Sequence, residues 1–204
     1  NETEHRLDVW CSKGADRPYG DFAIEGAKAG KKFGTENKDK LNYINDFDWL
    51  KKTELVELHE VDCTKDPVRP ELDIKFRTSY GRKIYGLKHG EDIMAVMCFA
   101  FTNQVPKTVE EMDALSKDAA MQAVHRAGVQ GSIAIAYTVW SLKKGGGKMI
   151  VKEVYNMIKQ SNHLNRLVTL SPLTKMAEKF HLRNGARLIQ KNESTQNFEY
   201  VVLK

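Results

Sequence analysis

The sequence predicts an α/β fold, and the part of the chain after residue 132 carries the observations that predict it. Apolar runs of β type alternate there with helical stripes of apolar residues. In chain order they give strand, glycine loop, helix, strand, helix, strand, strand, which is the order of an α/β domain. The chain of 204 residues is long enough for one such domain with an N-terminal extension.

The N-terminal part has a different composition. Residues 1–40 are rich in Gly, Lys, Asp and Asn and carry only scattered apolar side chains, which predicts an extended or mobile arm. Apolar residues then recur at roughly helical spacing between Leu41 and Leu50. We therefore expect a single folded domain over residues 41–204.

The middle of the chain predicts a helix, a hairpin and an inserted helix. Residues 70–80 suit a short helix that begins near Pro70, although their apolar alternation also suits a strand. Two apolar runs, 82–87 and 93–101, flank His89-Gly90-Glu91-Asp92 and predict a hairpin. Thr108 and Glu111 form a capping box, so we expect a helical insertion over about 108–127, between two strands.

The C-terminal elements are the most regular. In chain order we expect a strand at 133–140, a glycine loop at 142–148, a helix over 150–158, a strand at 167–170, a helix over 172–182, and strands at 186–190 and 198–203.

The glycine loop has the composition of an anion site. It lies between a strand and an amphipathic helix, where backbone N–H groups and the helix N-terminus favour negative charge. We predict cofactor-binding roles for the residues of this loop, which are Lys143, Lys144, Gly145, Gly146, Gly147 and Lys148. A P-loop is excluded, because its pattern requires Gly at Leu142 and Ser or Thr at Met149. A flexible basic turn on the surface is the alternative.

Two further motifs follow the loop. The first is Thr169-Leu170-Ser171-Pro172, and the second is Phe180-His181-Leu182-Arg183-Asn184-Gly185-Ala186. Together with the glycine loop they resemble the GNAT acyltransferase superfamily, and most of all the C-terminal GNAT-like domain of malonyl-CoA decarboxylases. Leu142 stands where the GNAT loop has Arg or Gln, so Lys143 or Lys144 would supply that charge.

The resemblance implies a GNAT-like mixed central sheet flanked by helices. It further implies a coenzyme A thioester, malonyl-CoA or acetyl-CoA, as substrate, and Ser171 and His181 as the catalytic pair. Loss of CO2 from a malonyl thioester leaves an enolate, which needs hydrogen-bond donors at oxygen and a proton at carbon.

Local structure offers another interpretation of the same residues. Ser171 followed by Pro172 suits a helix N-cap and first turn, and Asn184-Gly185 suits a helix stop. A lone histidine is more often structural than catalytic.

Two other functions remain open at this stage. An N-acyltransferase that uses acetyl-CoA needs a base, and residues 133–141 hold no carboxylate, which leaves Glu71, Glu110 or Glu111 as candidates. The third function is a non-catalytic protein that binds coenzyme A or nucleic acid. The net charge of +5 suits a polyanionic ligand, but no nucleic-acid motif accompanies it, so we do not expect nucleic acid as a partner.

Composition sets the remaining expectations. Three widely spaced cysteines predict neither a disulfide framework nor a zinc site, and we expect no metal and a cytoplasmic protein. The sequence contains no run of about 18 apolar residues, so it predicts no membrane span. The oligomeric state stays open.

Overall fold

The computed structural model describes residues 53–125 and 130–204. The chain divides into two units, Asn1–Lys51 and Lys52–Lys204, and everything described lies in the second. The predicted arm at 1–40 and the apolar spacing between Leu41 and Leu50 lie outside the described residues.

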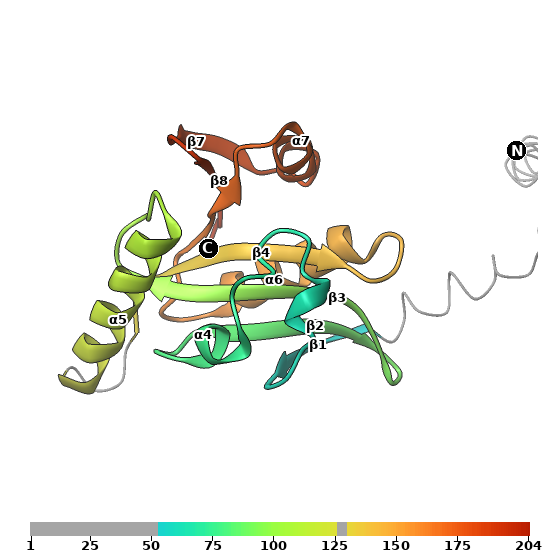
Figure 1. Cartoon of the computed structure of the whole chain (residues 1–204), viewed down its shortest axis with the longest axis horizontal. Coiled ribbons are helices and arrows are strands. Elements are labelled where there is room, and N and C mark those ends of the chain that lie inside the picture. The colour runs from blue at the N-terminus through green and yellow to red at the C-terminus, as the bar shows by residue number, and fades with distance from the viewer. Residues whose placement is uncertain (1–52, 126–129) are drawn as a thin grey trace, which may run out of the picture. The chain divides into compact units, whose positions relative to one another are not determined.

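A mixed sheet of eight strands forms the centre of the second unit (Figure 1). The strand order is β1-β2-β3-β4-β5-β8-β6, and β7 pairs with β8 beside this path. The strands are β1 (Thr53–Leu58), β2 (Lys83–His89), β3 (Asp92–Thr102), β4 (Ile133–Ser141), β5 (Arg166–Thr169), β6 (Ser171–Pro172), β7 (Arg187–Lys191) and β8 (Thr195–Tyr200). The helices are η4 (Cys63–Lys65), α4 (Ile74–Thr78), α5 (Val109–His125), α6 (Gly146–Gln160) and α7 (Lys175–Arg183).

Most of the predicted elements are confirmed. The hairpin is β2 and β3, paired antiparallel, and the ambiguous segment 70–80 contains the short helix α4. Half of the predicted capping box is present at the start of α5, because Thr108 Oγ1 accepts from the Glu111 amide at 3.1 Å. The Glu111 side chain accepts from the Lys107 amide at 2.6 Å instead of from the Thr108 amide. The last two residues of the predicted insertion, 126–127, lie outside the described part.

Three expectations need correction. Strand β1 was not predicted, because its burial follows no simple alternation along Thr53–Leu58. The helix expected over 172–182 begins only at Lys175, and the strand expected at 198–203 is β8, which begins at Thr195. Pro172 pairs with Thr195 of β8 instead of starting the helix, and Thr174 is the N-cap of α7. Strand β8 ends at Tyr200, and its polar residues Thr195, Gln196 and Asn197 are buried, because contacts with neighbouring strands decide the conformation there.

The helices cover both faces of the sheet. Apolar side chains of α4 and α5 pack with the inward residues of β2 to β5 in one core that includes Phe76, Met112 and Ile135. Helix α6 lies behind β3 and β4 in Figure 1 and buries its own stripe, which consists of Ile150, Val151, Val154 and Ile158. Helix α7 and strands β7 and β8 stand together beyond β4.

The sheet forks between β4 and β5. These two strands are parallel and paired from Ile133 opposite Arg166 to Ala136 opposite Thr169, and the Leu170 amide still donates to the Ala136 carbonyl at 2.9 Å. Beyond this point β6 pairs with β8, while the rest of β4 stays with β3. A β-bulge marks the fork, since Thr138 pairs with Cys98 and Ala136 with Phe99, which leaves Tyr137 as the extra residue.

Candidate functional site

A cavity of about 340 Å³ occupies the fork. Its walls come from β4, from the segment around Ser171, from α7 and from residues 65–68. It extends along β4 as far as Leu142 and Gly147 of the glycine loop. The fork therefore joins the predicted anion site to the predicted catalytic pair in one hollow.

Ser171 and His181 are in direct contact on the wall of this cavity. Ser171 Oγ lies 2.9 Å from His181 Nε2 and 2.9 Å from Thr169 Oγ1, and His181 Nδ1 lies 2.9 Å from the Tyr200 hydroxyl. Strands β5, β6 and β8 and helix α7 each contribute to this chain of four polar side chains. The Phe198 amide donates to Thr169 Oγ1, so the far end of the chain is fixed to the sheet.

His181 is enclosed by aromatic rings. It is 6% exposed, stacks on Phe198 at 5.1 Å between ring centroids, and meets the edges of Phe180 and Tyr200. This burial lowers the pKa of His181 to about 4, because the charged imidazolium loses its hydration. Burial likewise raises the pKa of the Tyr200 hydroxyl. The ring of His181 is therefore neutral near pH 7, with a donor on one nitrogen and an acceptor on the other.

Ser171 is not the cap of α7. It belongs to β6 and is 4% exposed, and the N-cap is Thr174, whose side chain accepts from the Ala177 amide at 3.2 Å. The capping interpretation of Ser171 and Pro172 is thus wrong. The predicted stop at Asn184-Gly185 is confirmed, since Asn184 is the C-cap and Gly185 has φ 88°.

The glycine loop turns tightly into α6. Gly145 is the N-cap with φ 84°, and a β-carbon on Gly146 would lie 2.6 Å from the Met94 carbonyl oxygen. The Gly146 amide donates to the Lys143 carbonyl, and the Gly147 amide donates to Ser141 Oγ. Within the described residues no acceptor is recorded for the amides of Lys144, Gly145 and Lys148. These three N–H groups at a helix N-terminus suit an anion.

The three loop lysines differ in their surroundings. Lys143 Nζ pairs with Asp92 Oδ2 at 2.6 Å, at the tip of the hairpin between β2 and β3. All three line a second hollow above the loop, which shares Gly147 and Phe180 with the main cavity. Among the described residues no carboxylate pairs with Lys144 or Lys148, so these two remain available to a ligand.

The cavity walls are mostly apolar. In the part of the chain that the structure describes, no Asp or Glu lines the main cavity. Glu71, Glu110 and Glu111, the candidate bases for amine transfer, are absent from its walls. Among the lining residues that the structure describes, Lys65 is the only lysine, arginine or carboxylate side chain.

Sequence reasoning missed several residues of the site. Tyr200 lies 19 positions after its partner His181, at the end of β8 and outside the two motifs. Arg69 was also missed, although it is 8% exposed and bonds carbonyls on both sides of the fork. The sequence gives no signal for it, because Arg69 stands among charged residues and prolines in the segment 64–73.

In the ranges 53–125 and 130–204, no helix combines the length and the apolar character needed to cross a bilayer.

Several solved structures are similar to the described part of the chain. A GNAT-like decarboxylase, GphF, in complex with isobutyryl-CoA matches with TM-score 0.56 and 10% identity, over 74% of this chain and 100% of that one. The loading GNATL domain of CurA from Lyngbya majuscula matches with TM-score 0.52 and 12% identity, over 74% of this chain and 98% of that one. Malonyl-CoA decarboxylase from Cupriavidus metallidurans gives TM-score 0.44 and 17% identity, over 66% of this chain and 35% of that one.

No protein-family model matches the sequence, and no curated protein does. The structural matches show the fold: the described part of the chain has the GNAT architecture that the sequence motifs implied, a mixed sheet with helices on both faces.

Proposed function

We propose that this protein is an acyl-CoA enzyme that decarboxylates a malonyl-type thioester, converting malonyl-CoA to acetyl-CoA and CO2. The observation that carries the proposal is the Ser171–His181 contact of 2.9 Å on the wall of an apolar cavity that reaches the glycine loop. The GNAT-like decarboxylase with the same fold, which binds isobutyryl-CoA, supports the choice of ligand.

The ligand has one natural orientation in this cavity. Its pyrophosphate suits the free amides of Lys144, Gly145 and Lys148, with the lysine side chains nearby. The pantetheine arm then follows β4 into the fork, whose walls are largely apolar. The thioester and acyl group come to lie at the other end, beside Ser171 and His181.

The chemistry needs few groups. As the C–C bond to the carboxylate breaks, its electron pair moves into the thioester to form an enolate, and CO2 leaves. The enolate carbon then takes up one proton, which balances the reaction to acetyl-CoA. The Ser171 hydroxyl and the His181 N–H are donors for the enolate oxygen and sources of this proton.

Tyr200 sets which nitrogen of His181 carries the proton. When its hydroxyl donates to Nδ1, the single N–H of the neutral ring is on Nε2, on the side of Ser171 and the cavity. The negative charge that develops on the enolate raises the proton affinity of the ring system. Proton delivery then runs through Nε2 or the Ser171 hydroxyl, with replacement from solvent after product leaves.

Amine acetylation with acetyl-CoA is the second candidate, which the resemblance of the sequence to the GNAT acyltransferases left open. That reaction needs a group to accept the ammonium proton, often a carboxylate, and the described cavity walls carry none. His181 is a weak base for the purpose, since burial lowers its pKa to about 4. A protein that only binds coenzyme A is the third candidate.

Product analysis by mass spectrometry separates these functions. With malonyl-CoA and no acceptor, we expect acetyl-CoA and CO2, and with acetyl-CoA alone we expect no reaction. Release of free CoA from acetyl-CoA only when an amine is added, with malonyl-CoA left intact, would assign an acyltransferase instead. Binding of both thioesters without any product would leave a binding protein.

A further inference from the structure

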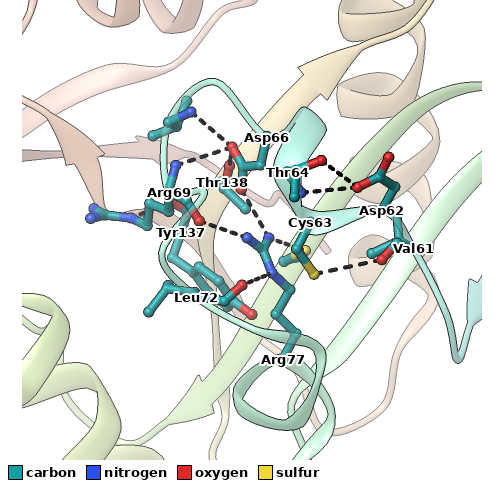
Figure 2. A network of polar contacts seen from close by, with 12 residues as sticks. Val61, Asp62, Cys63, Thr64, Asp66, Arg69, Leu72, Arg77, Tyr137 and Thr138 are labelled. Carbon is teal, nitrogen blue, oxygen red and sulfur yellow. Dashed lines mark hydrogen bonds and ion pairs between the residues drawn. The ribbon is translucent and has the colours of Figure 1, made fainter.

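One wall at the acyl end of the cavity is a loop that is fixed by buried charges. Lys65, Pro67 and Val68 of this loop line the cavity. Between them stands Asp66, which is 1% exposed and accepts from the Val68 amide at 2.8 Å and from Thr138 Oγ1 at 2.8 Å. Figure 2 shows Asp66 at the centre of this polar network.

Two arginines complete the network. Arg77 is fully buried, and its Nη1 pairs with Asp66 Oδ2 at 2.9 Å while its Nη2 donates to the Arg69 carbonyl at 2.7 Å (Figure 2). Arg69 donates from Nε to the Tyr137 carbonyl and from Nη2 to the Leu170 carbonyl, each at 3.0 Å. Arg69 therefore anchors the loop to both sides of the fork, to Tyr137 of β4 and to Leu170, the residue directly before Ser171.

The contact with Thr138 places this wall at the acyl end. Thr138 lies three residues before Ser141, which corresponds to roughly 10 Å along a strand. If the phosphates lie over the glycine loop, residues 65–68 face the far end of the ligand. A rigid wall there can select among acyl groups.

Charge at this end distinguishes one acyl group from another. An isolated carboxylate in an apolar cavity is costly unless a cation accompanies it. Lys65 is the only side chain on the described cavity walls with a full charge at neutral pH, and its pairing with Asp62 is loose, at 3.7 Å with both side chains more than half exposed.

We propose that Lys65 is the recognition residue for a carboxylated acyl group, so that the protein selects acyl-CoA thioesters whose acyl end carries a negative charge. This inference rests on the proposed function for the placement of the ligand. Lys65 acts on capture: the negative charge moves away from the carboxylate as CO2 leaves, so Lys65 contributes to binding rather than to the chemical step.

Two stable analogues of coenzyme A test this selection. The thioether 2-carboxyethyl-CoA carries its carboxylate at the same number of bonds from sulfur as malonyl-CoA, and it cannot lose CO2. The matching 2-carbamoylethyl-CoA has the same shape with a neutral amide. The dissociation constants of both are measured by calorimetry for the full chain and for Lys65→Met, with Lys65→Arg as the charge-conserving variant.

The wild-type protein should bind the carboxylate analogue about 5- to 10-fold more tightly than the amide. A ratio of this size is expected from one partly exposed ion pair. Lys65→Met should abolish this preference while leaving the affinity for the amide unchanged, and Lys65→Arg should keep it. In turnover of malonyl-CoA, Lys65→Met should raise KM with kcat little changed. The preference should also shrink as salt rises.

A preference that persists in Lys65→Met, or equal wild-type affinity for the two analogues, would overturn the role of Lys65. Failure of the proposed function looks different, because the wild-type protein would then bind neither analogue, or would bind them without turning over malonyl-CoA.

Discussion

At the scale of single residues, the burial of His181 keeps its ring neutral and makes the free energy of unfolding depend on pH. A neutral ring inside an aromatic cage can relay a proton between Tyr200 and Ser171 without carrying a permanent charge. In the unfolded chain the same ring titrates with its ordinary pKa of 6.5, whereas in the folded protein burial lowers it to about 4. Between these values the unfolded state binds the proton and the folded state does not.

We therefore expect stability to fall as pH drops from 6.5 towards 4. The loss attributable to His181 reaches about 3 kcal/mol at the lower end of this window, from about 1.4 kcal/mol per pKa unit. Urea unfolding at pH 7.5 and at pH 4.5 measures it, with His181→Gln as the matched variant that does not titrate. The wild-type protein should lose more stability than the variant between these two pH values. Equal losses would show that the ring is not held neutral by burial.

Only some residues of the candidate site could be predicted from the sequence. Ser171 and His181 were predicted as a pair because the two motifs that contain them resemble those of malonyl-CoA decarboxylases. Tyr200, Arg69 and Asp66 were not, since each acquires its role from a partner on a distant element. No local pattern in the sequence predicts contacts between side chains on distant elements.

At the scale of elements, the start of α7 shows that helix capping and the predicted catalytic role belong to different residues. Because Thr174 caps the helix and Ser171 lies in a strand, only Thr174 should matter for capping. Thr174→Ala should lower the free energy of unfolding by about 1 kcal/mol, while Thr174→Ser, which keeps the hydroxyl, should stay near the wild type. Urea unfolding followed by circular dichroism gives both values. If Thr174→Ser were as unstable as Thr174→Ala, the hydroxyl would not be the cap.

The first turn of α6 offers a second test, on ligand binding. A β-carbon on Gly147 would lie 3.1 Å from the Phe180 ring, at the junction of the two hollows. Gly147→Met should therefore obstruct coenzyme A and weaken its binding about tenfold or more, the size of a steric misfit of 1–3 kcal/mol. Calorimetry measures the affinity, and Lys152→Met on the exposed side of the same helix is the control. Unchanged affinity in Gly147→Met would move the ligand away from the loop.

At the scale of the whole molecule, the order of elements was accessible from the sequence and the fork was not. Strand and helix periodicity over residues 82–101 and 133–190 predicted the hairpin and the α/β order, and the capping residues Thr108 and Glu111 predicted the inserted helix. The fork depends on a bulge at Tyr137 and on the way β6 continues along β8 instead of β4. These are pairing choices between strands, which a local pattern does not encode.

The fork also explains how one fold can join binding and chemistry. The diverging strands open a cavity whose walls include Gly147 of the predicted anion-binding loop, the Ser171–His181 pair and the loop around Asp66. The proposed function depends on decarboxylation at this pair.

Turnover of malonyl-CoA by His181→Ala tests that claim most directly. If His181 supplies the proton, the rate of CO2 release should fall by about 10²–10⁴-fold, the range typical for loss of a general acid. The affinity for 2-carboxyethyl-CoA should stay nearly unchanged, and the melting temperature is measured beside the rate so that a folding defect is recognised. Decarboxylation at the full wild-type rate in His181→Ala would contradict the account.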